Sequence, residues 1–516
     1  MNTVNWISWM TLIPVVGAGV IPFIGSPRVI HPRTLALLFS VISSLIGLKM
    51  WGDFETNRSG YQFVETYSWI PSLGINYQVG VDGLGIVMVL LTSLVLPFSM
   101  AMGKAPEKSP AGYYSLMLCL HGALIGAFTT LNFFHWFLYW ELSLIPAFFI
   151  VRLWGGSERK AASTTFFVYT MVGSISLLLA MLAVYLVTNT FDFAKLSIAG
   201  QNGTLAAGLA AKLGWLKQFP DGKTLSQVIF LMALLGFAIK VPLFPFHSWL
   251  PDTYSQAPSS TTMVLTGVMS KLGIYGMLRI LLPIFPDQAS SLAGPLSVLA
   301  VLTIVLSALA ALRSKELKSM LAYTSINHLG YCLLGVFALA TPFPHPAGLT
   351  KSYSELYSTT NGIVVQILSH GLIASSLFGL VAIFESRKEG CPNLDNCGGL
   401  RSQAPVFTGV MGLAIFASLG LPGLSGFVGE FLILNGAFAI KPGVTALATL
   451  GLLISAIAHL NVIQRIFCGP LHSKWSSFLD LTTRERLILT PVLGLIICVG
   501  LWPRLVLDAI RYYRLY

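Results

Sequence analysis

Residues 260–282 have the sequence STTMVLTGVMSKLGIYGMLRILL, and this stretch decides the class of protein. It is long enough to cross the hydrocarbon core of a bilayer, which takes about 20 predominantly apolar residues. Lys271 nevertheless stands near its middle, with apolar-dominated sequence on both sides. A charge at the centre of such a helix costs about 2.5–3.5 kcal/mol on the insertion scale. The stretch therefore predicts a membrane-spanning helix whose central charge needs a functional reason.

The composition of the whole chain leads to the same class. Of 516 residues, 55% are hydrophobic and only 10% are charged, with a mean hydropathy of +0.76. Soluble domains carry roughly 25% charged residues, so a soluble enzyme of this length would lack the charges to cover its surface. The same numbers exclude intrinsic disorder, and glycine without a three-residue period excludes collagen. We predict an all-α polytopic membrane protein.

Apolar runs of spanning length recur about 14 times between polar or Pro/Gly breaks. The strands of a membrane β-barrel would alternate at every second residue, and these runs do not. The predicted spans lie near residues 5–24, 33–51, 81–100, 113–133, 134–153, 164–187, 225–244, 260–282, 292–312, 320–340, 360–384, 406–438, 443–468 and 487–508.

Two of these runs contain a predicted helix break beside an ionisable residue. Pro242 and Pro245 follow Lys240, and Pro422 precedes Glu430 in a run that is too long for one straight span. Transporters with inverted repeats place broken helices at corresponding positions of their two halves. We therefore divide the chain into helices 1–3 (residues 1–112), a first repeat of helices 4–8 (113–284), a second repeat of helices 9–13 (285–468) and helix 14 (469–516).

The net charge of +11 does not indicate nucleic-acid binding, because no basic cluster with interleaved aromatic residues occurs. Basic residues instead collect in loops, and the loops after odd-numbered spans carry more Lys and Arg than the other side. The positive-inside rule then places both termini on the lumenal or periplasmic side. The first run has no Lys or Arg before Arg28, so we interpret it as a retained helix and not a signal peptide.

Cysteines and nucleotide motifs give no sign of a cofactor. Cys391 and Cys397 form a C-x5-C pair without a second pair or nearby histidines, so no metal site is predicted. The other four cysteines are interpreted as small buried residues because they lie in apolar runs: Cys119, Cys332, Cys468 and Cys498. No iron–sulfur, haem or nucleotide motif is visible, and we predict no cofactor in this chain.

Four charges lie at membrane depth, namely Glu141, Lys240, Lys271 and Glu430. The alternative explanation for such charges is a buried ion pair or a side chain that extends to the interface. We favour that alternative for Arg279, at the end of its helix. Two acids and two lysines at depth instead resemble a proton relay, because burial lowers the pKa of an amine and raises that of a carboxyl.

Histidines supply the intermediate steps of such a relay, because imidazole can donate and accept a proton at its two nitrogens. His328 and His370 occupy midspan positions with polar companions, and His247 lies near the first predicted break. A lone helix histidine is usually a packing residue. For three others the packing and relay interpretations stay equally open: His121, His135 and His459.

Several motifs in order resemble one protein family. They are KVPLFPFHSWLPD at 240–252, SQAP at 255–258, VDGL at 81–84, WEL at 140–142 with Gly155-Gly156, and LPGLSGF at 421–427. They closely resemble the antiporter-like membrane subunits of respiratory and photosynthetic complex I. Within that group the spacing is similar to the NuoM/NdhD type, chain 4 of NAD(P)H-quinone oxidoreductase. Because no long lateral helix follows residues 487–508, the NuoL/NdhF type is not expected.

The resemblance implies 14 transmembrane helices with two inverted five-helix repeats, and it implies roles for the buried charges. Glu141 and Lys240 would form the ion pair of the first half-channel, and Lys271 would be the central relay residue. The further implied roles are onward transfer by His328 and His370, a terminal acid at Glu430, and a water path shaped by His247 and Trp249 beside the breaks at Pro242 and Pro422.

The resemblance also implies the surroundings of the chain. Electrons would move in other subunits, which hold the quinone, iron–sulfur clusters and any flavin, while this subunit moves protons. Its partners would be lipids and the NuoL/NdhF-like and NuoN/NdhB-like subunits.

Residues 62–71 look similar to NdhD, and residues 254–258 to bacterial NuoM or to divergent cyanobacterial NdhD paralogues. We favour a cyanobacterial paralogue in the thylakoid over a bacterial plasma-membrane protein, with plastoquinone as quinone, ferredoxin as a possible donor and a carbon dioxide-uptake module as a further partner.

Two other functions fit the same charge pattern. Subunits of multisubunit sodium/proton antiporters and of membrane-bound hydrogenases share the buried Glu and Lys residues. A third interpretation makes the chain an inert membrane anchor, for which Lys271 and Glu141 would be dispensable.

Overall fold

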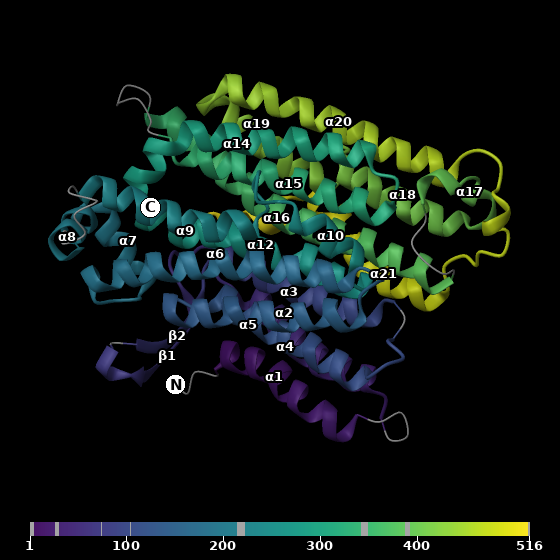
Figure 1. The fold of residues 1–516 in the computed structure, drawn as a ribbon, viewed down its shortest axis with the longest axis horizontal. Coiled ribbons are helices and arrows are strands. Elements are labelled where there is room, and N and C mark those ends of the chain that lie inside the picture. The colour runs from purple at the N-terminus through teal and green to yellow at the C-terminus, as the bar shows by residue number, and fades with distance from the viewer. Residues whose placement is uncertain are drawn as a thin grey trace.

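The computed structural model describes residues 5–25, 30–73, 75–103, 105–213, 222–341, 349–387 and 393–513. In this part of the chain the fold is a bundle of long helices that run roughly side by side, with one two-stranded hairpin (Figure 1). The predicted all-α polytopic class is confirmed.

Within the described ranges, 11 helices are long and apolar enough to cross a membrane, or up to 12 with one bent pair. They are α1 (Trp6–Ile24), α2 (Pro32–Asp53), α3 (Gly83–Ala101), α4 (Pro110–Thr129), α5 (Phe133–Trp154), α6 (Arg159–Thr188), α9 (Gly222–Lys240), the composite helix Ser259–Ile284, α14 (Pro286–Arg313), α16 (Leu349–Arg387), α20 (Pro442–Phe467) and the bent pair α21 (Thr483–Leu501) with α22 (Arg504–Ile510).

The predicted count of 14 is not confirmed, although every predicted run overlaps a helix. The run at 320–340 forms α15 (Leu317–Leu339), whose hydropathy is lowered by Asn327, His328 and other polar residues. The run at 406–438 is divided into α18 (Pro405–Leu419) and α19 (Ser425–Ile440), each shorter than a full span. Polar residues within a helix, or a break in a helix, therefore prevent some spans from being recognised by length and composition alone.

Both predicted helix breaks are present. Helix α9 ends at Lys240, and α10 (Trp249–Gln256) begins only after an irregular segment. Helix α18 ends at Leu419, and Gly420 adopts a φ of +83° in the left-handed region that favours glycine. Residues 420–424 then separate it from α19, so the break lies where Pro422 predicts it. The division into two five-helix repeats stays a prediction.

Two helices cross the centre of the bundle, and both are entirely buried over their apolar windows. One is α16. The other is the composite helix, which consists of α11 (Ser259–Val264), η2 (Leu265–Met269), α12 (Lys271–Gly276), η3 (Met277–Leu281) and α13 (Leu282–Ile284). Its segments η2 and η3 are π-helical, and such wider turns occur often at functional sites. Polar groups on these two helices are shielded from lipid by the surrounding helices.

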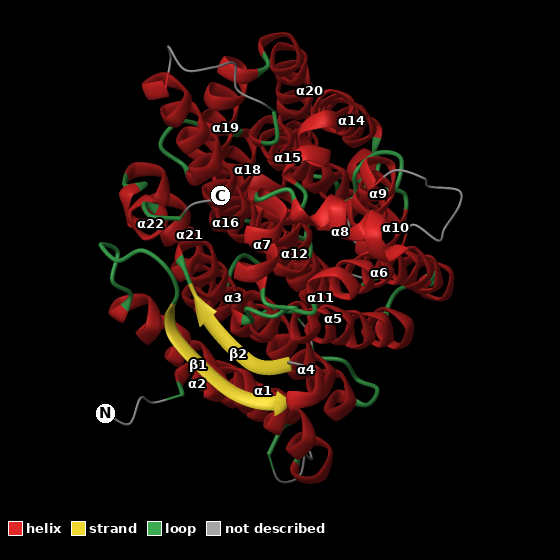
Figure 2. Cartoon of the chain, turned by 90° about the vertical axis from the view of Figure 1, so that its left-hand side faces the viewer, coloured by secondary structure: helices red, strands yellow, loops and turns green. Residues whose placement is uncertain are grey.

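Short elements gather at one end of the bundle. The hairpin pairs β1 (Gln62–Ile70) with β2 (Ile75–Val81), and α7 (Phe193–Gln201) and α8 (Thr204–Leu213) lie at the same end. Figures 1 and 2 place both chain termini at this end as well, as predicted for an even number of spans. Glu65 of the hairpin accepts hydrogen bonds from the first amides of α1, at 2.8 Å from the nitrogen of Ile7.

The opposite end holds α17 (Leu400–Gln403) and the segment before α21 (Figure 1). There Asp480 accepts hydrogen bonds from the first amides of α18, at 3.0 Å from Val406 and 2.8 Å from Phe407. Partial burial alone would raise the pKa of Asp480, but the amides of Val406, Leu481 and Phe407 outweigh it and lower the pKa. The carboxylate thus stays charged and caps the half-helix that leads to the second break.

The cysteine prediction is only partly right. Cys332 is buried, but Cys468 and Cys498 are exposed and Cys119 is partly buried. The error has a simple cause, because an apolar run on a peripheral helix has a face that meets lipid or another subunit. Cys391 lies outside the described residues.

Of the two structural explanations for Arg279, a buried ion pair or a side chain that extends to the interface, the structure shows the ion pair. Its guanidinium binds both carboxylate oxygens of Asp82, at 2.7 Å and 2.5 Å. The rings of Tyr61, Tyr275 and Tyr513 surround it at 5.4–5.6 Å from their centroids. This ion pair joins η3 of the central helix to the start of α3.

The variant Arg279→Ala leaves the carboxylate of Asp82 buried without its cation, so we expect it to destabilise the fold by about 3–5 kcal/mol. The matched control is Lys49→Ala, which breaks an exposed ion pair with Asp53 and should cost about 0–1 kcal/mol. Thermal unfolding of both variants in detergent measures the difference. Equal unfolding midpoints would show that the Arg279 pair is not a structural anchor.

Candidate functional site

Lys271 lies at the centre of the site and is fully buried. Its amine contacts the backbone carbonyl of Thr266, the hydroxyl of Ser270 at 3.3 Å and Nδ1 of His370 at 2.9 Å. The π-helical turn of η2 places that carbonyl within reach, because it widens the backbone just before Lys271. No carboxylate forms an ion pair with Lys271 among the described residues. The amine is therefore held by neutral partners, one of which can itself exchange protons.

Two glycines allow Lys271 and His370 to meet. Gly267 of η2 and Gly371 of α16 lie at the crossing of the two central helices. A Cβ atom at Gly371 would lie 2.6 Å from the carbonyl oxygen of Gly267, closer than real Cβ contacts. Small residues at such crossings let membrane helices approach closely. The close crossing brings the amine and the imidazole, 99 residues apart in sequence, into contact.

The polar contacts continue from His370 to Glu430. The rings of His370 and His328 lie 5.3 Å apart between centroids. Nδ1 of His328 lies 2.7 Å from Oε1 of Glu430, and its Nε2 lies 3.1 Å from the hydroxyl of Ser418. A cavity of about 10 Å³ borders both histidines, close to the least volume that holds one water molecule. One water there would connect the two imidazoles.

Glu430 lies just after the second helix break, and the break shapes its surroundings. Its Oε1 also accepts a hydrogen bond from the Gln366 amide at 3.3 Å. A Cβ at Gly420 would lie 3.0 Å from Oε2, so this glycine leaves room for the carboxylate as well as turning the chain. The site predicted from Lys271, His328, His370 and Glu430 is thus one continuous series of buried contacts.

The expected ion pair between Glu141 and Lys240 is not formed. The Lys240 ammonium instead lies over the indole ring of Trp140, 4.7 Å from the ring centroid. Among the described residues no ion pair joins it to Glu141, and Oε1 of Glu141 is buried without a hydrogen bond. In this position the aromatic face of the indole is the partner of the ammonium.

Lys240 is nevertheless connected toward Lys271. A second cavity of about 10 Å³ is bordered by Lys240 and Trp249 on one side and by Ser270 on the other. Ser270 contacts the amine of Lys271. Ser270 therefore lies between the two lysines, in contact with the amine of Lys271 and on the cavity that Lys240 borders.

The residues predicted to shape the water path do not all lie at this cavity. Trp249 borders this cavity and donates its indole N–H to the carbonyl of Ile239 at 3.0 Å. His247 packs beside Phe244 within the break and is not among the residues that border the cavity. Pro242 lies in the first break and Pro422 in the second.

Sequence reasoning missed several members of the site. Ser270, Gln366 and Ser418 contribute hydroxyl and amide groups that are common in helices, so nothing in the sequence marked them. Thr266 contributes a backbone carbonyl, which any residue carries. His459 of α20, left open by the sequence, lies 6.2 Å from the His328 ring. The two other open histidines lie elsewhere: His121 contacts Ser40 at 3.2 Å, and His135 stacks on the hairpin residue Trp69 at 4.6 Å.

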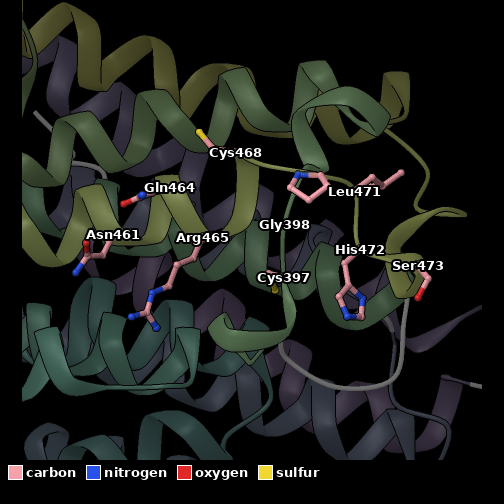
Figure 3. Close-up of a pocket in the computed structure, with 10 residues that line it drawn as sticks. Cys397, Gly398, Asn461, Gln464, Arg465, Cys468, Leu471, His472 and Ser473 are labelled. Carbon is pink, nitrogen blue, oxygen red and sulfur yellow. The ribbon is translucent and has the colours of Figure 1, made fainter.

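A separate surface pocket lies at the end of α20 (Figure 3). It has a volume of about 770 Å³ and is bordered by Cys397, Arg465, Cys468 and His472, among others. In Figure 3 the side chain of Cys468 points away from Cys397. No group of three metal-ligating side chains occurs among the described residues. None of the relay residues borders this pocket.

The fold and this site define the class of protein. A family model described as "NADH:quinone oxidoreductase/Mrp antiporter, TM" matches residues 130–455. This range includes the six residues predicted to form the relay: Glu141, Lys240, Lys271, His328, His370 and Glu430. The chain therefore belongs to this family of membrane subunits.

Individual relatives show which members of this family the chain resembles. The chain is 34% identical to NADH-quinone oxidoreductase subunit M of Rhodobacter capsulatus, over 98% of this chain and 95% of the relative. It is 33% identical to NAD(P)H-quinone oxidoreductase chain 4 2 of Thermosynechococcus vestitus, over 97% of this chain and 89% of the relative. These relatives confirm the resemblance seen in the sequence motifs.

Solved structures agree with the fold. A chain of respiratory complex I from Thermus thermophilus superimposes with a TM-score of 0.82 at 27% identity, covering 99% of both chains. A chain of the Mrp complex from Dietzia gives a TM-score of 0.81 at 19% identity, covering 99% of this chain and 98% of that one. The second likeness shows a shared fold alone.

The close helix crossing at Gly371 leads to a testable prediction, because a larger residue there would push the two helices apart. We expect Gly371→Ala to cost about 1–3 kcal/mol through overpacking and to separate Lys271 from His370, so that coupled proton transfer falls. The control is Gly412→Ala on α18, where a Cβ would meet nothing within 4 Å. Unfolding midpoints and proton translocation in membrane vesicles test both variants. Normal translocation by Gly371→Ala would show that the close crossing is dispensable.

Proposed function

We propose that this chain is a proton-translocating membrane subunit of a complex I-type NAD(P)H or ferredoxin:quinone oxidoreductase. The observation that carries the proposal is the series of buried contacts from Lys271 through His370 and His328 to Glu430. Each neighbour in this series can give or take a proton, and the helices around it exclude bulk water.

The proposed path begins at Glu141 and Lys240. A proton on Lys240 passes through the small cavity and Ser270 to Lys271. Lys271 and His370 share it across their 2.9 Å contact, since an ammonium donates to an unprotonated Nδ1 and a protonated Nδ1 donates to a neutral amine. A water between the imidazoles and the 2.7 Å contact of His328 then deliver the proton to Glu430. Each transfer moves one positive charge along a chain of otherwise neutral groups.

The remaining parts of the proposal concern the assembly. We place the redox steps, with quinone, iron–sulfur clusters and any flavin, in other subunits, and we propose that this chain needs no cofactor of its own. Its partners are other antiporter-like membrane subunits. We propose a thylakoid location, which fits the similarity to a Thermosynechococcus vestitus NAD(P)H-quinone oxidoreductase chain. The loop charges support a position of both termini on the lumenal side. The polar and charged relay, in turn, argues against an inert anchor.

A sodium/proton antiporter subunit is the second candidate, because the family includes Mrp antiporters and the Dietzia chain shares the fold. The Rhodobacter and Thermosynechococcus relatives, at one-third identity over nearly the whole chain, are named as quinone oxidoreductase subunits, which favours the first proposal. Translocation that depends on quinone reduction and not on sodium distinguishes the two.

We expect Lys271→Ala and Glu141→Gln each to abolish most of the proton translocation that accompanies quinone reduction. Lys271→Ala removes the central acceptor, and Glu141→Gln removes the carboxylate that attracts the Lys240 ammonium. Native complex carrying each variant, reconstituted in proteoliposomes with a pH-sensitive dye, provides the measurement. Lys49→Ala, at an exposed position, serves as the control. Normal pumping by both buried-site variants would refute the relay.

A further inference from the structure

Trp140 and Glu141 are consecutive residues of α5, so their side chains leave the helix about 100° apart. In this structure the Lys240 ammonium lies over Trp140 and, among the described residues, forms no ion pair with Glu141. Its position over the Trp140 ring is occupied in this structure, and Glu141 is the charged group that attracts it. The lysine has two alternative partners on one turn of one helix.

The Trp140 ring is held so that one face is available to the ammonium. Its indole N–H donates to the hydroxyl of Ser174 on α6 at 2.9 Å. The ring of Trp136 packs against it at 4.8 Å between centroids, and Phe237 meets it edge-on at 5.8 Å. Trp140 is only 2% exposed. A hydrogen bond and two aromatic contacts thus orient the indole independently of its contact with Lys240.

The surroundings of the ammonium make this contact important. Among the described residues, Lys240 forms no ion pair, and no hydrogen bond from its amine is recorded. The residue is 3% exposed, so the aromatic face replaces water as a partner for the charge. Tryptophan offers the strongest cation–π contact of the aromatic residues, and such contacts strengthen when they are desolvated.

In the position over Trp140, Lys240 borders the cavity that leads to Ser270 and Lys271. We propose that Trp140 is a positioning residue for proton transfer, which holds the Lys240 ammonium in a forward position away from Glu141. The lysine exchanges between Glu141, where it is retained, and the indole face, from which it transfers its proton toward Lys271. This assignment rests on the proposed proton-relay function and adds the group that opens its first ion pair.

The test replaces Trp140 in the native complex with tryptophans that carry increasing numbers of ring fluorines. Fluorine withdraws charge from the ring face and weakens its attraction for a cation, while the volume and the N–H donor are nearly kept. Losing the contact changes the ratio of the two lysine positions by roughly 5- to 30-fold. We expect proton translocation in proteoliposomes to fall stepwise with each fluorine, and a carboxylate infrared band, assigned by its absence in Glu141→Gln, to shift as Glu141 gains the ammonium.

The same substitutions at Trp136 are the matched control, because this ring stacks on Trp140 without contacting the ammonium. The assignment would be overturned if proton translocation did not change with the number of fluorines at Trp140. It would also be overturned if fluorination of Trp136 lowered translocation equally. The Lys271→Ala variant distinguishes a failure of the Trp140 role from a failure of the whole proton relay. If it stops pumping while the fluorine series is flat, only the role of Trp140 is wrong; if it pumps normally, the relay and this role fail together.

Discussion

Lys271 is completely buried, and no carboxylate of the described residues forms an ion pair with it. This buried amine is the constraint on which the rest of the structure depends. An isolated charge in an apolar environment is costly, and the cost falls only if polar groups replace the lost water. Lys271 receives a carbonyl, a hydroxyl and an imidazole nitrogen. The carbonyl requires the π-helical turn, and the imidazole requires the close crossing at Gly267 and Gly371. The geometry of both central helices is thus fitted to a single amine.

The carboxylates lie at the two ends of the series and not at its centre. Glu141 lies beyond Lys240 at one end, and Glu430 contacts His328 at the other. A carboxylate beside Lys271 would hold the ammonium in a stable ion pair and stop onward transfer. Neutral partners at the centre and acids at the ends leave the proton free to move between them. The Arg279–Asp82 pair shows the contrasting case, a buried ion pair with bidentate contacts that anchors one end of the central helix.

The sequence was sufficient to predict the membrane class and both helix breaks. It also singled out Lys271, His328, His370 and Glu430, because polar and charged residues are rare in apolar runs and each one is conspicuous. The structure places these four side chains in one series of contacts, and their role as a relay stays a prediction. The position of Lys240 over Trp140 was not predictable in the same way. Tryptophan is common in membrane helices, and its contact with the ammonium depends on how α5, α6 and α9 pack. The π-helical turns escaped prediction for a related reason, since local backbone geometry does not alter composition.

The central claim is that protons pass from Lys271 to the Glu430 end through His370. The ratio of protons translocated to electrons transferred, measured for native complex carrying His370→Leu against Ser369→Ala as control, tests it most directly. The leucine keeps the packing of α16 but has no nitrogen to accept the proton, so the account predicts a lower ratio for His370→Leu and an unchanged one for the control. A ratio equal to that of the unaltered complex would contradict the account.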